Sequence, residues 1–343
     1  MLKKIIPIIL CFCLALSVGC SKNKESLEVE KVQESTSSEK KEELYVNSLT
    51  GVAELTKAEA SQRPVAIMIN NISTAQPVQT GLNKADIVYE TEVEGGITRL
   101  LAVYKNVNKV EKVGTVRSAR YVYIDLAMGH DAIYIHHGQD PNYAAPHLKH
   151  TTAFTLSEKN AGARISNGLS KEHTLYAYGE KLWNFLQKSK INTQSNTDST
   201  WQKFADKDTS VAFSNTANSV TVPFSNSYKT TFKYDSATGE YTRFFKNVER
   251  KDYNTKESTT VKNVFVLYTT MSNYPLEKYR KVALESGNGY YFVNGTYTPI
   301  IWSKGASSNG FTFKNTDGTE LTVNQGSSWV CIADKNKSQA IIG

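Results

Sequence analysis

Three glutamates alternate along one apolar segment of the 343-residue chain: Glu90, Glu92 and Glu94. Side chains of an extended strand alternate with a period of two, so the three carboxyl groups share one strand face. A pair of them, with Glu90 and Glu94 as the candidates, could act as general acid and general base, as in glycoside hydrolysis. The alternative is a solvated strand face without a catalytic role, since alternation alone explains the pattern.

Polar residues also follow the ends of other strand-like segments. VAIMI runs into two asparagines, GTV into an arginine-rich segment, and DAIYI into two histidines. Ligands bind outside the carboxyl ends of strands in open α/β sheets, so we expect these side chains to share a cleft if their strands form one sheet. The predicted ligand-binding residues are Asn70, Asn71, Arg99, Arg117, Ser118, Arg120 and His173.

The arginines in this group indicate recognition of an anion. Arg117 and Arg120 flank the expected start of a helix, where Ser118 is the predicted N-cap and free backbone N–H groups favour negative charge. Together with Arg99 they could hold a carboxylate or a phosphate through paired hydrogen bonds. The competing interpretation is purely structural, with Arg99 or Arg117 paired to a glutamate inside the sheet.

Histidines supply the remaining acid–base candidates. His136 and His137 end one strand and point to opposite sides if the backbone is extended, so at most one faces a cleft. The alternative is a structural, hydrogen-bonded histidine. His147 and His150 have helical spacing, but no carboxylate stands at ligand spacing beside them. We therefore predict no metal and no cofactor, since phosphate-loop, dinucleotide-binding, metalloprotease and nucleophile-elbow motifs are also absent.

Residues 1–20, MLKKIIPIILCFCLALSVGC, have the pattern of a lipoprotein signal peptide. Two lysines precede an apolar stretch too short for a membrane-spanning helix, and the segment ends in a lipobox-like SVGC. Cys20 is the predicted lipidation site, and its acyl chains would anchor the chain to the extracytoplasmic face of the cell membrane. The alternative is an ordinary secretory signal. Cys331 would be the one unmodified cysteine left, so no disulfide partner is predicted, which suits a Gram-positive envelope.

Changes in amino-acid composition and in the periodicity of apolar residues divide the remaining chain into segments. Residues 21–60 are rich in Glu, Lys, Ser and Thr and predict a flexible polar tether. Residues 61–195 hold buried-strand patterns, a Gly95-Gly96 hairpin signal and helical patterns over 119–129 and 179–189, which predict an α/β (α+β) domain with a mixed sheet. A linker is expected over 196–209. Short alternating runs in residues 210–343 predict a mainly antiparallel β domain.

The charge balance argues against a nucleic-acid-binding protein. The chain has 40 Lys+Arg and 33 Asp+Glu, a formal charge of +7, and no basic run exceeds two residues. A mild positive excess spread over this length is instead typical of a solvated surface. It would suit a protein that faces anionic wall polymers and lipid headgroups.

Several blocks of the sequence occur in a recognisable order after the lipobox. They are RPVAIMINN, ADIVYETEVEGGITRLLAVYKN, KVGTVRSAR and DAIYIHHG in the first half, and YDSATGEYTRF, TVKNVFVLYT and NGTYTPIIWSKG in the second. These blocks resemble the YerB family of bacterial lipoproteins. The resemblance spans roughly residues 60–340, and its most specific parts are EGGITR and VRSAR. It implies an exported, two-domain lipoprotein but supplies no reaction.

Two functional hypotheses follow. The preferred one is a non-catalytic envelope lipoprotein whose α/β cleft binds an anionic or glycan cell-wall ligand, while the β domain contacts a polymer or an envelope protein. The other is a wall-active hydrolase or transferase with glutamate and histidine acid–base chemistry. A solute-binding transport subunit ranks third, because the two halves are not similar α/β lobes.

Overall fold

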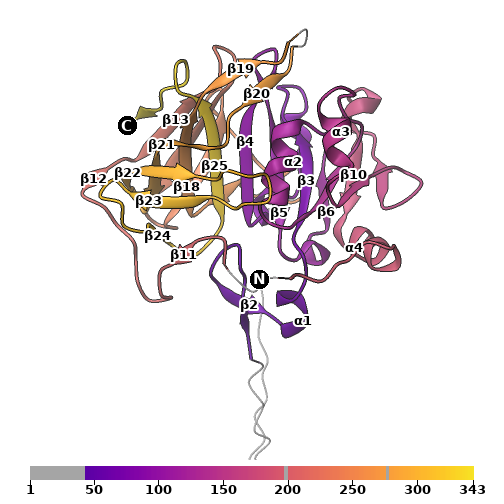
Figure 1. The fold of residues 1–343 in the computed structure, drawn as a ribbon, viewed down its shortest axis with the longest axis horizontal. Helices are drawn as coiled ribbons and strands as arrows, with labels where there is room; N and C mark the ends of the chain where they lie inside the picture. Colours follow the sequence, from indigo (N-terminus) through magenta and orange to yellow (C-terminus); the bar gives the residue numbers. More distant parts are fainter. Residues whose placement is uncertain (1–42, 197–199, 276–277) are drawn as a thin grey trace, which may run out of the picture. The chain divides into compact units, whose positions relative to one another are not determined.

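The computed structural model describes residues 43–196, 200–275 and 278–343. These residues belong to one compact unit, Glu43–Gly343, which is built mostly from strands (Figure 1). The predicted signal peptide, the lipidation site Cys20 and the first part of the predicted tether lie outside the described residues. Within the described part, every helix is too short or too polar to cross a bilayer.

The last part of the predicted tether has regular structure instead. Strands β1 (Tyr45–Val46) and β2 (Ala53–Leu55) pair antiparallel, and helix α1 (Lys57–Ala60) follows them. Thr56 and Glu59 form a capping box, in which each side chain accepts a hydrogen bond from the other residue's backbone N–H. The tether prediction is therefore wrong for residues 45–60. The overall composition of residues 21–60 is polar, but a short hairpin and a capped helical turn give this last part regular structure.

The centre of the fold is a mixed sheet. Its N-terminal part has the spatial order β4 (Ile87–Glu94), β5 (Ile97–Tyr104), β3 (Val65–Asn70), β7 (Ile133–His136) and β8 (Ala153–Thr155). β3 pairs antiparallel with β5 and parallel with β7, and all six of its residues are buried, as expected of a strand covered on both faces. Gly95 and Gly96 have φ angles of 58° and 74° and form the predicted hairpin turn.

The C-terminal half of the chain extends the same sheet to eleven strands. β25, yellow in Figure 1, lies between β18 and the N-terminal strand β4 and pairs parallel with both. The sheet is thus continuous across the two predicted domains, while the other pairs that this half adds to the large sheet are antiparallel, as predicted. The added strands are β12 (Asn215–Thr216), β18 (Asn263–Thr269), β21 (Ser286–Val293), β22 (Thr296–Ser303), β23 (Thr312–Asn315) and β25 (Ser328–Asp334).

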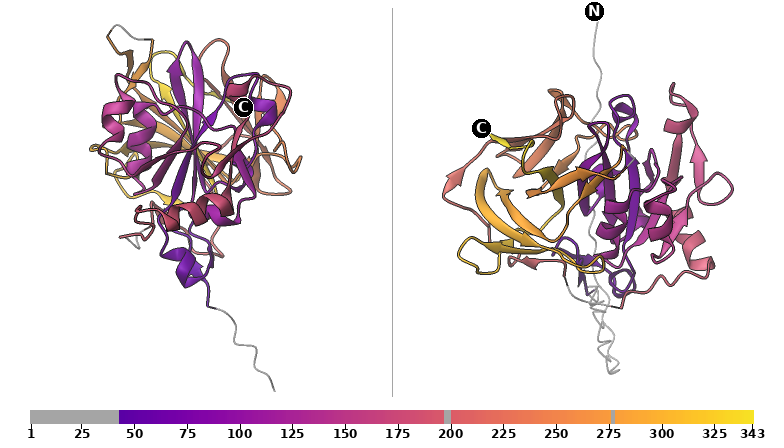
Figure 2. Two further views of the ribbon diagram at one scale, coloured as in Figure 1. Left: turned by 90° about the vertical axis from the view of Figure 1, so that its right-hand side faces the viewer. Right: turned by 45° about the horizontal axis from the view of Figure 1, so that its top comes forward.

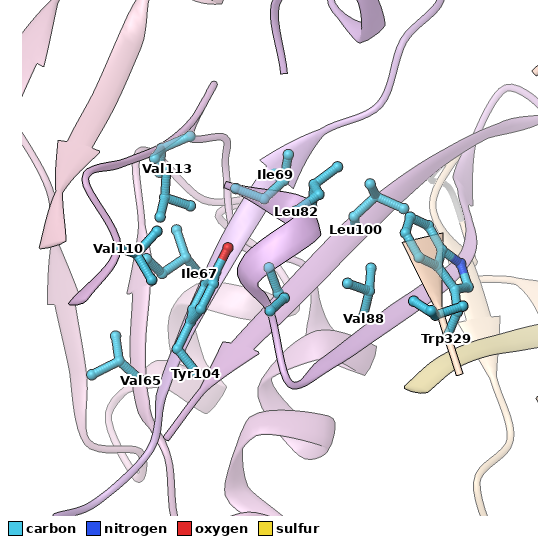
Figure 3. Close-up of a cluster of buried hydrophobic side chains, with 14 of the residues drawn as sticks. Val65, Ile67, Ile69, Leu82, Val88, Leu100, Tyr104, Val110, Val113 and Trp329 are labelled. Atoms are coloured by element: carbon cyan, nitrogen blue, oxygen red, sulfur yellow. The ribbon is translucent and has the colours of Figure 1, made fainter. Parts of the chain in front are cut away.

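A second, six-stranded sheet packs on one face of the large sheet, and both contribute to one hydrophobic cluster. Figure 3 shows part of this cluster, from Val65 and Ile67 to Leu100 and Trp329. Phe232 of the second sheet packs on Trp329 with ring centroids 5.6 Å apart. The strands are β13 (Ser219–Pro223), β14 (Lys229–Asp235), β15 (Glu240–Phe245), β16 (Val248–Glu249), β17 (Thr260–Val261) and β26 (Ile341–Ile342).

Helices α2 (Tyr121–Met128) and α3 (Ala144–Leu148) lie together, and α2 contributes to a second hydrophobic cluster with the opposite side chains of β3, β4 and β5. In the left view of Figure 2 they are the magenta helices to one side of the central strands. α2 begins after Arg120, which makes no side-chain capping bond, so the prediction of Ser118 as N-cap is wrong. Helix is sparser in this half than an α/β domain implies.

Smaller elements complete the fold. Helix α4 (Gly179–Lys188) confirms the predicted amphipathic helix, with Leu182, Trp183 and Leu186 buried.

β6 belongs to a separate sheet with β10 and β9. β11 lies inside the expected linker and pairs with β24. The bounds are β6 (Lys112–Gly114), β9 (Gly162–Arg164), β10 (Leu175–Tyr178), β11 (Lys203–Phe204), β24 (Thr322–Val323), the β19 (Met271–Asn273) and β20 (Arg280–Val282) hairpin, and the 3₁₀ turns η1 (Gln76–Val78), η2 (Leu82–Lys84), η3 (Val107–Lys109) and η4 (Lys171–His173).

Candidate functional site

The carboxyl ends of three strands lie at one edge of the large sheet. β3 is parallel to β7 and antiparallel to β5, which is antiparallel to β4, so β3, β4 and β7 run in the same direction. Asn70, Glu94 and His136 end these strands. The strands therefore share an edge as the sequence suggests, but the predicted site residues divide among separate hydrogen-bonded clusters.

Glu90 is fully buried between the two sheets. Its carboxylate accepts hydrogen bonds from the Thr98 hydroxyl (2.9 Å), the Thr230 hydroxyl (3.0 Å) and Trp329 Nε1 (3.2 Å). Asn71 Nδ2 donates a fourth at 3.1 Å. Burial raises the pKa of Glu90, although Arg243 and the hydrogen-bond donors act in the opposite direction. A carboxylate enclosed in this way joins two sheets and is poorly placed to reach a substrate.

Arg243, on β15 of the second sheet, is the buried cation of this cluster. Its guanidinium donates to Asn71 Oδ1 (3.0 Å) and Gln79 Oε1 (3.2 Å) and lies 4.8 Å from the ring of Trp329. Burial lowers its pKa to about 10, while Glu90 raises it. We refer to Asn71, Gln79, Glu90 and Arg243 as the buried polar cluster. It holds the two halves of the chain together through polar contacts.

Glu94 holds two of the predicted anion-binding arginines. Its Oε1 lies 2.8 Å from Arg99 Nη2 and 2.6 Å from Arg120 Nη2, and its Oε2 accepts a second bond from Arg120 Nε at 2.8 Å. Arg99 also donates to the carbonyl oxygen of Ser118. Hydrogen bonds from Arg120 and the charges of both arginines hold the pKa of Glu94 below its usual value despite its burial. This arrangement matches the structural alternative for Arg99, in which a glutamate inside the sheet is its partner.

Asn70, His173, Glu172 and Arg117 form a separate series of side-chain contacts. Asn70 Nδ2 donates to His173 Nδ1 at 2.8 Å, which leaves the His173 Nε2–H facing Glu172 Oε1 at 3.4 Å. Glu172 also pairs with Arg117 at 2.6 Å and is more than half exposed. Burial lowers the pKa of His173, whereas Glu172 raises it. Arg117 and His173 thus share one carboxylate at the surface, away from the buried Glu90.

The two adjacent histidines have separate partners. His136 is buried and its Nδ1 bonds to the carbonyl oxygen of Gly138 at 2.8 Å. His137 Nδ1 donates to the Leu156 carbonyl oxygen at 2.7 Å, and its Nε2 faces Arg164 at 3.2 Å. Burial lowers the pKa of His136, which disfavours its charged form. The two imidazoles therefore differ in environment, as alternation along a strand implies.

A groove lies beside α2 and α3, next to the β19–β20 hairpin, which is at the top of Figure 1. Its volume is about 680 Å³, within the range of small-ligand sites. Both halves of the chain line it, since Lys281 to Glu285 and the loop Gly305 to Ser307 come from the C-terminal half. We call it the tyrosine groove, after Tyr121, Tyr143 and Tyr274; Asp125 and His147 also line it.

Four aromatic rings lie in sequence along the tyrosine groove. His147 stacks on Tyr121 with centroids 4.4 Å apart, and Tyr143 stacks on Tyr274 at 3.8 Å. Tyr121 and Tyr274 meet edge to face at 6.3 Å, which joins the two stacks. The hydroxyl of Tyr143 also donates a hydrogen bond to the Pro275 carbonyl oxygen at 3.1 Å. The rings are therefore held in place before any ligand arrives.

Two acidic side chains, Asp125 and Glu285, line the same groove. Asp125 Oδ1 lies 2.6 Å from His147 Nε2, and Glu285 is exposed at the rim. Burial and the nearby Tyr121, Asp125, Asp140 and Tyr143 raise the pKa of Tyr274 to about 12. Within the described ranges, no group of three or more His, Cys, Asp or Glu side chains could hold a metal ion. The groove offers ring faces and hydrogen-bond acceptors.

Comparison with known sequences identifies the family. Residues 49–192 match the model of the "Protein of unknown function (DUF3048) N-terminal domain", and residues 220–330 match that of its C-terminal domain. The chain is also 31% identical over 295 residues to the "Putative lipoprotein YerB" of Bacillus subtilis strain 168, which covers 83% of this chain and 85% of the relative. The chain belongs to the YerB family.

A solved structure carries the same fold. The crystal structure of the YerB protein from Bacillus subtilis matches with a TM-score of 0.75 and 25% identity, over 87% of this chain and 99% of that one. The two family models match residues 49–192 and 220–330, and one sheet runs through both parts in the structure.

Sequence reasoning missed two features of this YerB-family chain. Arg243 stands at an inward position of β15, between the buried Tyr241 and Phe245, and a charged residue in such an alternating pattern is a signal that can be found. The tyrosine groove has a weaker signal: Tyr121 and Asp125, like Tyr143 and His147, are four residues apart on consecutive helical segments. The roles predicted for the strand-end residues stay predictions.

Proposed function

We propose that this YerB-family chain is an extracytoplasmic lipoprotein, anchored to the cell membrane by lipidated Cys20, that binds a cell-wall polymer in the tyrosine groove. The observation that carries the binding role is the groove itself, where three tyrosines are already packed against one another, two of them stacked and two edge to face. The relative named a putative lipoprotein and the lipobox-like SVGC support the anchor.

Binding is favoured over hydrolysis or group transfer by the contacts of the acid–base candidates. Glu90 accepts hydrogen bonds from four buried donors, and Glu94 is held between two arginines. His136 is buried against the backbone. General acid–base catalysis needs a group that reaches the reacting atoms, and these groups already have internal partners.

Cys20→Ser should abolish membrane anchoring. The wild-type chain is expected to partition into the detergent phase on phase separation, and the variant into the aqueous phase, because two acyl chains contribute about 0.8 kcal/mol per buried CH₂. Cys11→Ser is the matched control, since Cys11 would leave with the signal peptide, and it should partition like wild type. Detergent-phase recovery of Cys20→Ser would contradict the anchor.

Tyr121→Ala should release the protein from cell-wall material. We expect the chain from residue 21 onward, which includes the whole compact unit Glu43–Gly343, to co-sediment with purified cell-wall sacculi. Loss of one stacking ring should weaken this binding about tenfold, near the upper end of aromatic-pair energies. Tyr253→Ala, on the loop between β16 and β17, is the control for loss of a half-buried tyrosine outside the groove.

The same assay separates the two functional classes. Equal binding by wild type and Tyr121→Ala, or no binding by wild type, would contradict the proposed role of the groove. Release of soluble wall fragments by wild type would support the hydrolase instead, and their loss in Glu94→Gln or in a His137 variant would identify its acid–base residues. Fragment release should be absent if the protein only binds.

A further inference from the structure

We infer that the ligand of the tyrosine groove is an uncharged saccharide chain, packed on Tyr121 and Tyr274 and hydrogen-bonded by Asp125. This inference rests on the proposed function, because it names the ligand class of the same groove. It differs from anion binding by the strand-end arginines, which the sequence suggests. Three observations carry it: the ring faces, the hydrogen-bond acceptors and the balance of charge.

The rings provide the apolar half of the recognition. Tyr121 and Tyr274 are each half-buried and each has one aromatic neighbour stacked on it, so their positions are fixed by His147 and Tyr143. Sugar rings expose C–H faces that pack flat on an aromatic ring, and their edges carry hydroxyls. Two rings meeting at 63° offer two differently oriented surfaces, which suits successive units of a twisted chain.

The polar half comes from carboxylate oxygens. His147 occupies one side of Oδ1 of Asp125, and a carboxylate has about four acceptor positions, so Asp125 retains capacity for sugar hydroxyls. The side chain of Asp125 is 13% exposed, which places these acceptors at the groove wall rather than in bulk solvent. Glu285 adds a second, exposed acceptor at the rim.

The charges in and beside the groove are mixed and include no arginine pair among the described residues that could hold a polyanion. Asp125 and Glu285 line it together with one lysine, Lys281, and two histidines, His147 and His150, of which His147 pairs with Asp125. Lys304 lies close by, and its ammonium donates hydrogen bonds to the carbonyl oxygens of Ala306 (3.2 Å) and Ser307 (2.8 Å). A phosphate or carboxylate polymer would meet the two carboxylates of the groove without the paired arginines that the sequence suggests for anion binding, since Glu94 occupies Arg99 and Arg120.

Calorimetric titration of the chain from residue 21 onward tests the ligand class. The probes are an N-acetylglucosamine tetramer, which is neutral, a glucosamine tetramer, which is cationic, and poly(glycerol phosphate), which is anionic. We expect the neutral tetramer to bind with a Kd that changes less than about twofold between 50 and 500 mM NaCl, because an uncharged ligand makes no ion pairs that salt could screen. Both charged probes should bind more weakly than the neutral tetramer. Any electrostatic contribution to their affinity should decrease as the salt concentration rises.

Variants locate the contacts. Tyr121→Ala should weaken tetramer binding about tenfold and Tyr121→Phe less than about twofold, because the ring rather than the hydroxyl makes the contact. Asp125→Asn should weaken it about fivefold through loss of an acceptor. Unchanged thermal unfolding of Tyr121→Phe and Tyr253→Ala keeps the comparison free of folding effects.

Each contrary result has a distinct meaning. Tighter binding of the cationic or the anionic probe overturns the assignment of an uncharged saccharide. Binding to sacculi without binding to the tetramer overturns this inference and leaves the proposed function standing. Failure to bind both overturns the proposed function as well.

Discussion

Arg243→Ala should lower the free energy of unfolding by about 3–5 kcal/mol, the range for removing one member of a buried ionic group. The substitution leaves Glu90 fully buried without its cation and removes the donors that Asn71 and Gln79 accept from. Urea unfolding of the chain from residue 21 onward measures the loss. The control is Arg250→Ala, a half-buried arginine of the same region whose guanidinium contacts the Glu249 carbonyl oxygen, and it should lower stability by about 1 kcal/mol or less.

The loss should also depend on pH, because of Glu90. The folded-state pKa of Glu90 is raised, so ionisation of Glu90 opposes folding as pH rises from the unfolded value near 4.5 through the folded pKa. Arg243 lowers that pKa, and its removal moves the window upward. The destabilisation of Arg243→Ala should therefore grow as the pH rises through the folded-state pKa of Glu90 in the wild type. A loss that stays constant from pH 4.5 to the alkaline limit of the folded protein would contradict an ionised Glu90 as the source.

Glu94→Ala should lower the free energy of unfolding by about 3 kcal/mol, the lower end of the range for breaking a buried ion pair. Glu94 neutralises Arg99 and Arg120 together, and its loss leaves two guanidinium groups close to each other under partial burial. Burial and the charge of Arg120 already lower the pKa of Arg99 to about 10. Thermal and urea unfolding measure the effect.

Glu158→Ala is the matched control for Glu94→Ala. Glu158 also pairs with an arginine, Arg164, but its side chain is 54% exposed, so its removal should change stability by about 1 kcal/mol or less. The pKa of Glu94 is depressed, so its contribution is complete above about pH 4.5 and is lost as pH falls through the lower, folded value. Similar losses in the two variants would contradict a special role for Glu94.

Local patterns predicted many elements because their causes are local. VAIMI is apolar throughout and, with Asn70, becomes the fully buried β3, and Gly95-Gly96 supplies the positive φ angles of a tight hairpin. The amphipathic spacing of residues 179–189 becomes α4. The shared edge of β3, β4 and β7 also follows from reading polar residues at the ends of strands.

The partners of the charged residues could not be predicted in the same way. Glu90 receives Thr230 and Trp329 from positions 140 and 239 residues further along the chain. Whether Glu90, Glu94 and their neighbours face a cleft or one another depends on which distant strands pack on them. The sequence is compatible both with Arg99 binding a ligand anion and with Arg99 pairing to a glutamate inside the sheet. In the structure Arg99 pairs with Glu94.

The sequence by itself determined the family, many of the strands, the export signal pattern and the identity of the polar groups near the sheet edge, since each of these is written in contiguous residues. Only the tertiary structure decided that β25 joins the two halves into one sheet, that Arg243 meets the buried polar cluster, and that Tyr121, Tyr143 and Tyr274 line one groove. The physical reason is that these contacts link residues far apart in the chain, and packing, not local propensity, brings them together.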